Sequence, residues 1–319
     1  PAGSGYHSDG FKLITTDNKE FFLKKIKSYD LGFEFPERKV AALLVSHSMA
    51  NRANIHPKSL GVILHNNKME IMPEITEDTK IYQIQEYGGE GKSYMQMLDE
   101  KAKKEKVDKD DINEIEAVIN YITKIHATKH PINNKKRLTA IYNDNIRNVI
   151  GHPEYLLQLL HDMPKDNIVL APNAQSEYLS LMLENMHHFK DRPERVRALH
   201  GDFWGANIFF KDDNSLFVVD HSRMPWGEPG FDIGVCVSQF VFRYHLHKNE
   251  YYKELCEIFL QRYIEKTQDP EIRSTLVYSL GLIAAIYCSP KFVPNLDPKV
   301  RKAFYDHCML MLKEKKFSW

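Results

Sequence analysis

The first ninety residues alternate between short apolar runs and polar turns, which is the pattern of a small β-rich region. Residues 11–15 and 20–26 are predicted to form two strands joined by a turn at Asp17 and Asn18. An apolar helical stripe follows Pro36, a residue that suits the first turn of a helix. Further strands are predicted at residues 60–64, 69–72 and 81–87, the last ending at Gly88 and Gly89.

The rest of the chain is dominated by helical periodicity. From Asp111 to Ala127, isoleucines and a valine recur at intervals of three and four. Similar patterns predict helices at residues 142–150, 153–161, 176–187, 235–243, 251–263, 272–286 and 300–312. One short hairpin, with strands at residues 208–210 and 216–219, interrupts them. We therefore place a domain boundary at the paired glycines, between residues 1–88 and 89–319.

Composition and charge exclude several classes of partner. The 319 residues include 43 basic and 43 acidic ones, so no global charge favours nucleic acid or an anionic membrane surface. No apolar run approaches the length of a membrane span, and no signal peptide is visible. The chain begins at Pro1, which is compatible with a missing initiator or upstream segment. Four scattered cysteines predict free thiols in a reducing cytoplasm rather than a zinc site.

The strongest chemical signal is a loop and a hairpin that carry two acids and an amide. His200, Asp202 and Asn207 lie in a run with two glycines, so a tight loop can turn both polar side chains toward one point. The hairpin would then bring Asp220 back beside Asn207. Phosphoryl transfer uses such a set, because one carboxylate orients a hydroxyl while an amide oxygen and a second carboxylate hold magnesium against ATP. A single Asp after a strand often only caps a turn, but the joint pattern is harder to meet by accident.

The order His200, Asp202, Asn207 and Asp220 resembles the aminoglycoside phosphotransferase and choline kinase superfamily of small-molecule kinases. The match is specific across residues 199–234, and the Gly-Asp-Phe-Trp form is similar to fructosamine kinases and ecdysteroid-kinase-like proteins. The resemblance implies an α+β, bilobal, protein-kinase-like fold, with a small β-rich N-lobe carrying one main helix and a larger, mostly helical C-lobe. It also implies ATP as co-substrate, Mg²⁺ held by Asn207 and Asp220, and Asp202 as general base toward a small-molecule hydroxyl acceptor.

The resemblance gives nucleotide-binding roles to five residues of the N-lobe: Ser8, Lys24, Glu37, Glu86 and Tyr87. Ser8 lies in a glycine-spaced run that would cover the phosphates, although a plain hairpin turn also explains that run. Lys24 would contact the α- and β-phosphates and Glu37 would orient it. The alternatives are a solvated strand lysine and an acid placed for the helix dipole. Backbone groups near Glu86 and Tyr87 would bond the adenine edge.

Other residues near the motif are assigned to the acceptor or to support of the loop. The predicted acceptor contacts are Trp204, Arg223, Trp226 and Glu228, although Trp226 can equally anchor its own loop. His200 and Asp232 are expected to hold the catalytic loop in place. Asp232 belongs to a Phe-Asp-Ile-Gly run similar to choline kinases and methylthioribose kinases. We interpret His126 as a packed structural histidine.

Two positions depart from the pattern of the superfamily. Relatives often carry a second acid two residues after Asp220, and this chain has Ser222 there, which puts a second metal contact in doubt. His221 stands where an aromatic residue or a proline is common. The leading hypothesis is an ATP- and Mg²⁺-dependent kinase for a sugar or sugar derivative, with an amino alcohol as the next acceptor. The alternative is a nucleotide-binding pseudokinase with a regulatory or scaffold role. Oligomeric state is left open.

Overall fold

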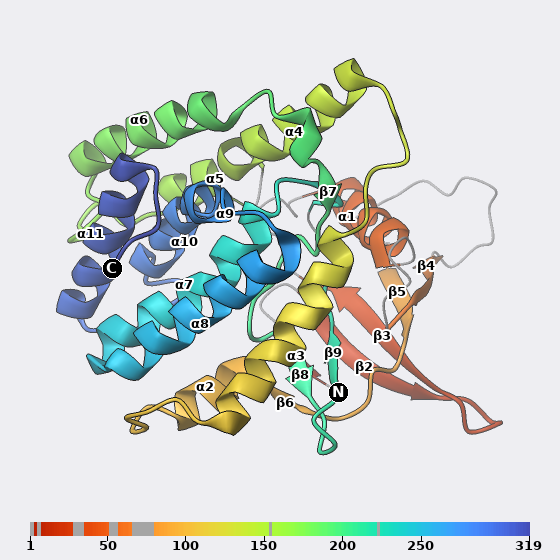
Figure 1. The fold of residues 1–319 in the computed structure, drawn as a ribbon. Coiled ribbons are helices and arrows are strands. Elements are labelled where there is room, and N and C mark those ends of the chain that lie inside the picture. The colour runs from red at the N-terminus through yellow and green to blue at the C-terminus, as the bar shows by residue number, and fades with distance from the viewer. Residues whose placement is uncertain are drawn as a thin grey trace.

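The computed structural model describes residues 3–4, 8–27, 35–50, 57–65, 80–152, 155–221 and 224–319. These residues form a small antiparallel sheet with one helix and a larger, mostly helical part (Figure 1). The predicted α+β architecture, with a β-rich N-terminal part and a helical C-terminal part, is confirmed. The strand predicted at residues 69–72 lies outside the described residues.

The small sheet has the strand order β1-β2-β3-β5-β4, and every pairing is antiparallel. Its strands are β1 (Gly3–Ser4), β2 (Ser8–Ile14), β3 (Glu20–Ile26), β4 (Ser59–His65) and β5 (Lys80–Glu86). The predicted turn joins β2 and β3, and Asn18 takes a left-handed φ of 61° there, which asparagine tolerates. This register places Gly10 opposite Lys24, so the residue directly across from the lysine carries no side chain.

Helix α1 (Pro36–Ala50) packs against β4 and β5. Its contact with the sheet is partly polar, because the fully buried Gln83 of β5 donates to Ser46 Oγ (3.2 Å) and to Ser59 Oγ (2.8 Å). Val40 and Leu43 add apolar packing. Hydrogen bonds therefore hold this helix on the sheet alongside apolar burial.

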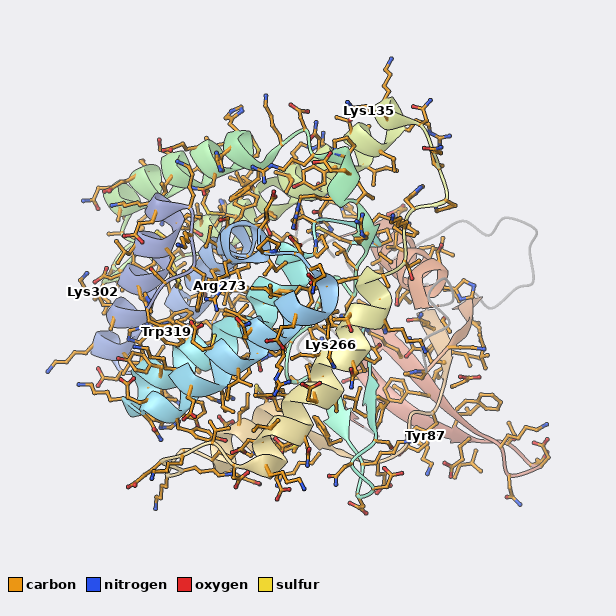
Figure 2. All side chains as sticks on the ribbon, viewed as in Figure 1. Tyr87, Lys135, Lys266, Arg273, Lys302 and Trp319 are labelled. Carbon is orange, nitrogen blue, oxygen red and sulfur yellow. The ribbon has the colours of Figure 1, made fainter. Side chains whose placement is uncertain are left out.

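The chain leaves the small sheet through a glycine-rich segment after β5. Tyr87, labelled in Figure 2, lies at this exit. Gly88 approaches the hairpin so closely that a Cβ atom would lie 2.5 Å from Phe217 Cδ2, and Gly89 has a φ of 103° that favours glycine. Strand β6 (Lys92–Ser93) and helix α2 (Tyr94–Glu100) follow, and Ser93 caps the helix in a capping box.

The larger part is built from helices around the buried helix α7 (Gly230–His247) (Figure 1). The other helices are α3 (Lys109–His126), α4 (Lys135–Gly151), α5 (Leu156–His161), α6 (Pro172–Phe189), α8 (Glu250–Thr267), α9 (Ile272–Thr275), α10 (Val277–Cys288) and α11 (Pro298–Glu314), with the short 3-10 helix η1 (Pro193–Arg195). Residues 230–243 of α7 are all buried, and α7 packs against α8, α10 and α11. The predicted apolar stripe of α3 is buried, and α3 packs against α8. The single helix predicted at residues 272–286 is divided into α9 and α10 at Leu276.

Short strands connect the helices near the small sheet. Strand β7 (Arg197–Ala198) pairs with β10 (Trp226–Gly227), and β8 (Ile208–Phe210) pairs with both β9 (Leu216–Val218) and β6. The predicted hairpin is therefore confirmed. All four cysteines are buried and carry free thiols. None of the helices in the described ranges is long and apolar enough to span a membrane.

Candidate active site

The loop between β7 and β8 holds the first two predicted site residues side by side. The N–H of Trp204 donates to Asp202 O (2.7 Å) and the N–H of Asn207 donates to Trp204 O (2.8 Å), so the loop is tight. Asn207 Nδ2 donates to the backbone oxygen of Asp202 (2.9 Å) and to its carboxylate Oδ2 (3.1 Å). The Asn207 amide therefore holds Asp202 and turns its own oxygen, Oδ1, away from it.

The hairpin of β8 and β9 brings Asp220 to the same place. Ile208 pairs with Val218, and the N–H of Val219 donates to Asn207 O (2.9 Å). Asp220 then has a φ of 64°, a left-handed conformation that aspartate adopts more readily than most residues. Asp220 and Asn207 consequently line one cleft.

Lys24 on β3 reaches this acid from the small sheet. Its Nζ lies 2.5 Å from Asp220 Oδ1. The Lys24 side chain is 13% exposed and that of Asp220 is 32% exposed, so the pair is partly shielded from water and attracts more strongly than a surface pair. The resemblance had paired Lys24 with Glu37. Glu37 is exposed on the first turn of α1, and within the described ranges no hydrogen bond or ion pair joins it to Lys24, so its role stays a prediction.

A cleft of about 920 Å³ lies between the small sheet and the hairpin, a size that suits a small-molecule ligand. The predicted nucleotide-binding and metal residues that line it are Ser8, Lys24, Glu86, Tyr87, Asn207 and Asp220. Phe209 and Phe217 also line it, with stacked rings whose centroids are 5.2 Å apart. Lys12 Nζ lies 4.6 Å from the centroid of the Tyr87 ring. The cleft thus combines apolar surface with charged groups of both signs.

Glu86 makes two contacts with the backbone of Lys58. Its N–H donates to Lys58 O (2.8 Å), and its carboxylate Oε2 accepts from the N–H of Lys58 (3.1 Å). The Glu86 N–H therefore already donates a hydrogen bond to Lys58. Any backbone donor to an adenine edge at this exit has to come from Tyr87 or the residues after it.

Behind the loop, Asp232 on the first turn of α7 accepts two backbone N–H groups. Its Oδ2 accepts from His200 (2.7 Å) and its Oδ1 from Gly201 (2.9 Å), which has a φ of 85°. His126 Nε2 lies 3.1 Å from Asp232 Oδ2, and His126 Nδ1 lies 2.8 Å from the hydroxyl of Tyr263. Because Asp232 and His126 are buried, they act on the loop rather than on a substrate.

Two histidines pack beneath the acids of the loop. His200 Nδ1 accepts the N–H of Asp202 (3.2 Å), and its ring lies on that of His221 with centroids 4.0 Å apart. Burial lowers the pKa of both histidines, so both rings are neutral at pH 7. Tyr121 of α3 bonds His221 Nε2 through its hydroxyl (3.2 Å) and stacks on Phe203 of the loop. The rings support the loop without adding charge to it.

A comparison with protein families identifies the chain. The sequence profile described as the phosphotransferase enzyme family matches residues 72–271, which is more than half of the chain. The chain belongs to the phosphotransferase enzyme family. It is therefore a kinase that transfers phosphate to a hydroxyl group of a small molecule.

Solved structures share the fold of this phosphotransferase. A thermostable mutant of aminoglycoside phosphotransferase APH(4)-Ia, in ternary complex with ADP and hygromycin B, covers 99% of this chain and 93% of its own at 13% identity and a TM-score of 0.55. An amicoumacin kinase in complex with AMP-PNP, Ca²⁺ and Ami covers 98% and 87% at 12% identity and a TM-score of 0.51. An ethanolamine kinase of Plasmodium vivax covers 98% and 80% at 11% identity and a TM-score of 0.50. No curated protein sequence matches the chain.

One of the predicted acceptor contacts of this phosphotransferase lies on the loop and is only partly buried. Trp204 is half-buried, and its ring centroid lies 6.1 Å from that of Tyr287. It follows Asp202 by two residues, and its contact with an acceptor stays a prediction. Arg223 and Ser222 lie outside the described residues.

Two other predicted acceptor contacts, Trp226 and Glu228, are buried. Trp226 packs edge-on against His130, with ring centroids 4.5 Å apart, which corresponds to the anchoring alternative. Glu228 accepts from Arg195 Nε (2.6 Å) and Nη2 (2.7 Å) and from the hydroxyl of Tyr142 (2.9 Å). Burial and then the Glu228 charge raise the pKa of Tyr142, so its hydroxyl stays a donor. The Glu228 carboxylate is thus engaged inside the protein, and the substrate role expected for it stays a prediction.

Sequence reasoning missed two features of the cleft. One is the direct pairing of Lys24 with Asp220. The other is the aromatic wall formed by Phe209 and Phe217. The run 208–210 was interpreted only as a buried strand, yet alternation along a strand places Phe209 on the face opposite its two neighbours. In β8 the two neighbours are buried and Phe209 is only partly buried. Applying the alternation rule to the predicted strand could therefore have identified Phe209 as a cleft residue.

Proposed function

We propose that this phosphotransferase moves the γ-phosphate of ATP to a hydroxyl group of a small metabolite, with Mg²⁺ as the metal. The proposal is carried by the convergence of Lys24, Asn207 and Asp220 on one cleft, with Asp202 bonded to Asn207. The acceptor oxygen forms a bond to the γ-phosphorus, and the bond from that phosphorus to the β–γ bridging oxygen breaks, which releases ADP. Asp202 orients the hydroxyl and accepts its proton, which then passes to solvent.

The donor atoms in the cleft fit a magnesium ion. Mg²⁺ prefers oxygen ligands, and Asp220 offers a carboxylate while Asn207 offers Oδ1. Because Asn207 Nδ2 bonds to Asp202, the amide is already turned to leave that oxygen facing elsewhere. The bound ion would neutralise charge that develops on the phosphates. The divalent ion and ATP analogue in the amicoumacin kinase structure support a metal–nucleotide site in this fold.

The charge of the cleft also favours an added cation. The described lining includes two cationic side chains, Lys12 and Lys24, and three acidic ones, Glu86, Glu90 and Asp220. A triphosphate brings several more negative charges into the same space. The described side chains alone therefore leave the bound nucleotide unneutralised, and a divalent cation corrects this.

We propose a sugar or sugar derivative as the acceptor, with an amino alcohol as the second choice. The aromatic face of Trp204 beside Asp202 would pack on the apolar face of a sugar ring. The shared fold with an ethanolamine kinase keeps the amino alcohol in the test. The pseudokinase alternative gains no support, because all three residues are present, with Asp202 bonded to Asn207 and Asn207 lining the same cleft as Asp220.

The test is ADP release from ATP across a panel of sugars, sugar derivatives and amino alcohols. The wild-type protein is expected to release ADP with at least one acceptor in Mg²⁺ and not in EDTA. With that acceptor, Asp220→Ala should lower kcat by on the order of 10³-fold, because the carboxylate that holds the metal is lost. The matched control is Asp212→Ala, the same change in the exposed turn of the same hairpin, which should keep the wild-type rate.

Two results would contradict this proposal in different ways. Full turnover by the Asp220→Ala protein with the true acceptor would show that Asp220 does not hold the metal. ATP binding without ADP release across the whole panel would favour a pseudokinase.

A further inference from the structure

Helix α7 presents two buried polar side chains to the catalytic loop. Asp232 and Gln239 are seven residues apart, which is about two helical turns and places them on the same face. Both are fully buried. Asp232 accepts the N–H groups at the start of the loop, as described above. Gln239 Oε1 accepts the N–H of Gly205 near its end (3.1 Å).

The Gln239 amide is held in one orientation by a second bond. Its Nε2 lies 3.4 Å from the backbone oxygen of Cys236, one turn earlier in the same helix. The carbonyl oxygen therefore points to the loop and the amino group to the helix. The site needs an acceptor and a donor on one neutral side chain, and glutamine supplies both.

Gly205 is fitted to this contact by having no side chain. A Cβ atom at this position would lie 2.0 Å from Gln239 Oε1, a distance that no real contact allows. The carbonyl of Gly205 in turn accepts the N–H of Met95 at the start of α2 (3.1 Å). Gly205 is therefore held from α7 on one side and from α2 on the other.

These contacts anchor the loop at two points, one shortly before Asp202 and one shortly before Asn207. Asp202 follows the first anchor, Gly201, by one residue, and Asn207 follows the second anchor, Gly205, by two. The bond from Asn207 Nδ2 to Asp202 Oδ2 closes across the interval. A shift at Gly205 would move Asn207 relative to Asp202.

We propose that Gln239 is a positioning residue for phosphate transfer, and that it fixes Asn207 against Asp202 by holding Gly205. This inference rests on the proposed function, because it assigns a consequence to the same site. It goes beyond it in predicting that a fully buried side chain on α7 sets the rate of transfer. Asp232 alone anchors only the first half of the loop.

The main test is Gln239→Leu, which keeps the approximate volume and removes both hydrogen bonds. We expect kcat to fall about 10- to 100-fold with the KM for ATP within about twofold of wild type, because misplacement of a reacting group by about 1 Å can cost 10²-fold. The matched control is Asn185→Leu on α6, which removes another fully buried amide that bonds backbone oxygens of Leu181 and Leu312. The control protein should lose stability but keep kcat.

A paired substitution tests the same idea if Gln239→Leu folds poorly. Gly205→Ala alone should lower kcat strongly, because its methyl group meets Gln239 Oε1. Adding Gln239→Ala removes the colliding atom but also the amide that holds Gly205, so the double variant should recover at least about fivefold in kcat over Gly205→Ala and still stay about 10-fold or more below wild type.

Hydrogen exchange gives a readout that does not depend on turnover. The Gly205 amide is expected to be protected in the wild-type protein and to exchange at least about tenfold faster in Gln239→Leu. The proposal is overturned if Gln239→Leu keeps kcat within twofold of wild type, if Asn185→Leu loses kcat equally, or if Gly205 exchange does not change. A wild-type protein that shows protection of Gly205 but no turnover on the panel would contradict the proposed function instead.

Discussion

The two sides of the cleft are held by different forces. Within the described ranges, the buried apolar cluster of the small sheet consists of Ile26, Val40 and Leu43, whereas the cluster of the helical part extends from Tyr94 to Phe317. Asp202 lies on a loop that this large core supports, and Asp220 follows strand β9 of the adjacent hairpin. Lys24, by contrast, lies on the sparsely packed side and meets Asp220 through an ion pair.

Under the proposed function, this difference separates the geometry of phosphate transfer from the binding of the nucleotide. On the helical side, buried hydrogen bonds from α7 fix the backbone of the loop, so its geometry is set when the chain folds. On the sheet side, the contact depends on charge and on partly exposed side chains. We therefore expect substitutions on the helical side to change the free energy of unfolding and, where they contact the loop or Asp220, the rate of transfer or the Mg²⁺ requirement. Substitutions on the sheet side should change nucleotide kinetics.

The largest effect is expected from breaking the buried ion pair of the helical part. Glu228→Ala removes the carboxylate that lies closest to the Arg195 guanidinium. The nearest remaining carboxylate is that of Asp269, at 2.8 Å. Removing one partner of a buried pair typically costs about 3–5 kcal/mol, so the free energy of unfolding should fall by about that amount in denaturant titrations. The folded fraction should keep the wild-type KM for the acceptor, because the Glu228 carboxylate is buried and engaged by Arg195 and Tyr142.

The matched control is Glu257→Ala, since Glu257 also pairs with an arginine, Arg273 at 2.6 Å, but is 41% exposed. Its loss should cost about 1 kcal/mol or less. A Glu228→Ala protein that is as stable as the control, or that loses acceptor affinity without losing stability, would support the substrate role predicted from the sequence.

Glu228 also shows where prediction from sequence ends. Local patterns were sufficient for α3, whose apolar spacing is its own signal, and for the hairpin after Asn207, whose turn and strands are contiguous. The burial of the Glu228 carboxylate depends on its ion pair with Arg195, which is 33 residues away in the sequence. No local pattern near either residue indicates that they pair. The pairing of Lys24 with Asp220 joins residues 196 positions apart and depends on how the sheet sits over the hairpin. A motif gives the kind of chemistry, while burial and long-range partners decide which polar residues carry it.

A smaller effect, and on kinetics alone, is expected on the sheet side. Lys24→Met removes the cation that faces Asp220 and should lower kcat/KM for ATP by about 10- to 100-fold, as loss of a charge aimed at phosphates does elsewhere. Because the pair is only partly buried, the midpoint of thermal unfolding should stay close to that of wild type. Lys25→Met is the control, since Lys25 is adjacent on β3 but does not line the cleft. Equal losses in both proteins would mean that general charge, and not the position of Lys24, matters.

The smallest expected effect lies at the boundary between the two sides, where Tyr121 reaches the residue after Asp220. Tyr121→Phe removes only the hydroxyl that bonds His221 Nε2 and keeps the ring that stacks on Phe203. The lost hydrogen bond should cost about 0.5–1.5 kcal/mol of stability. If the hydrogen bond from Tyr121 to His221 also holds the neighbouring Asp220 in place, the Mg²⁺ concentration for half-maximal rate should rise about two- to tenfold in this variant.

Tyr178→Phe makes the comparison specific. It removes a buried hydroxyl that donates to Gly281 O (2.6 Å) in the distant part of the helical core. Both tyrosine variants should lose similar stability, but only Tyr121→Phe should change the Mg²⁺ requirement. If the Mg²⁺ requirement is unchanged in both, the support of the large core stops at the loop around Asp202, and Asp220 belongs with Lys24 to the side of the cleft that is held by charge.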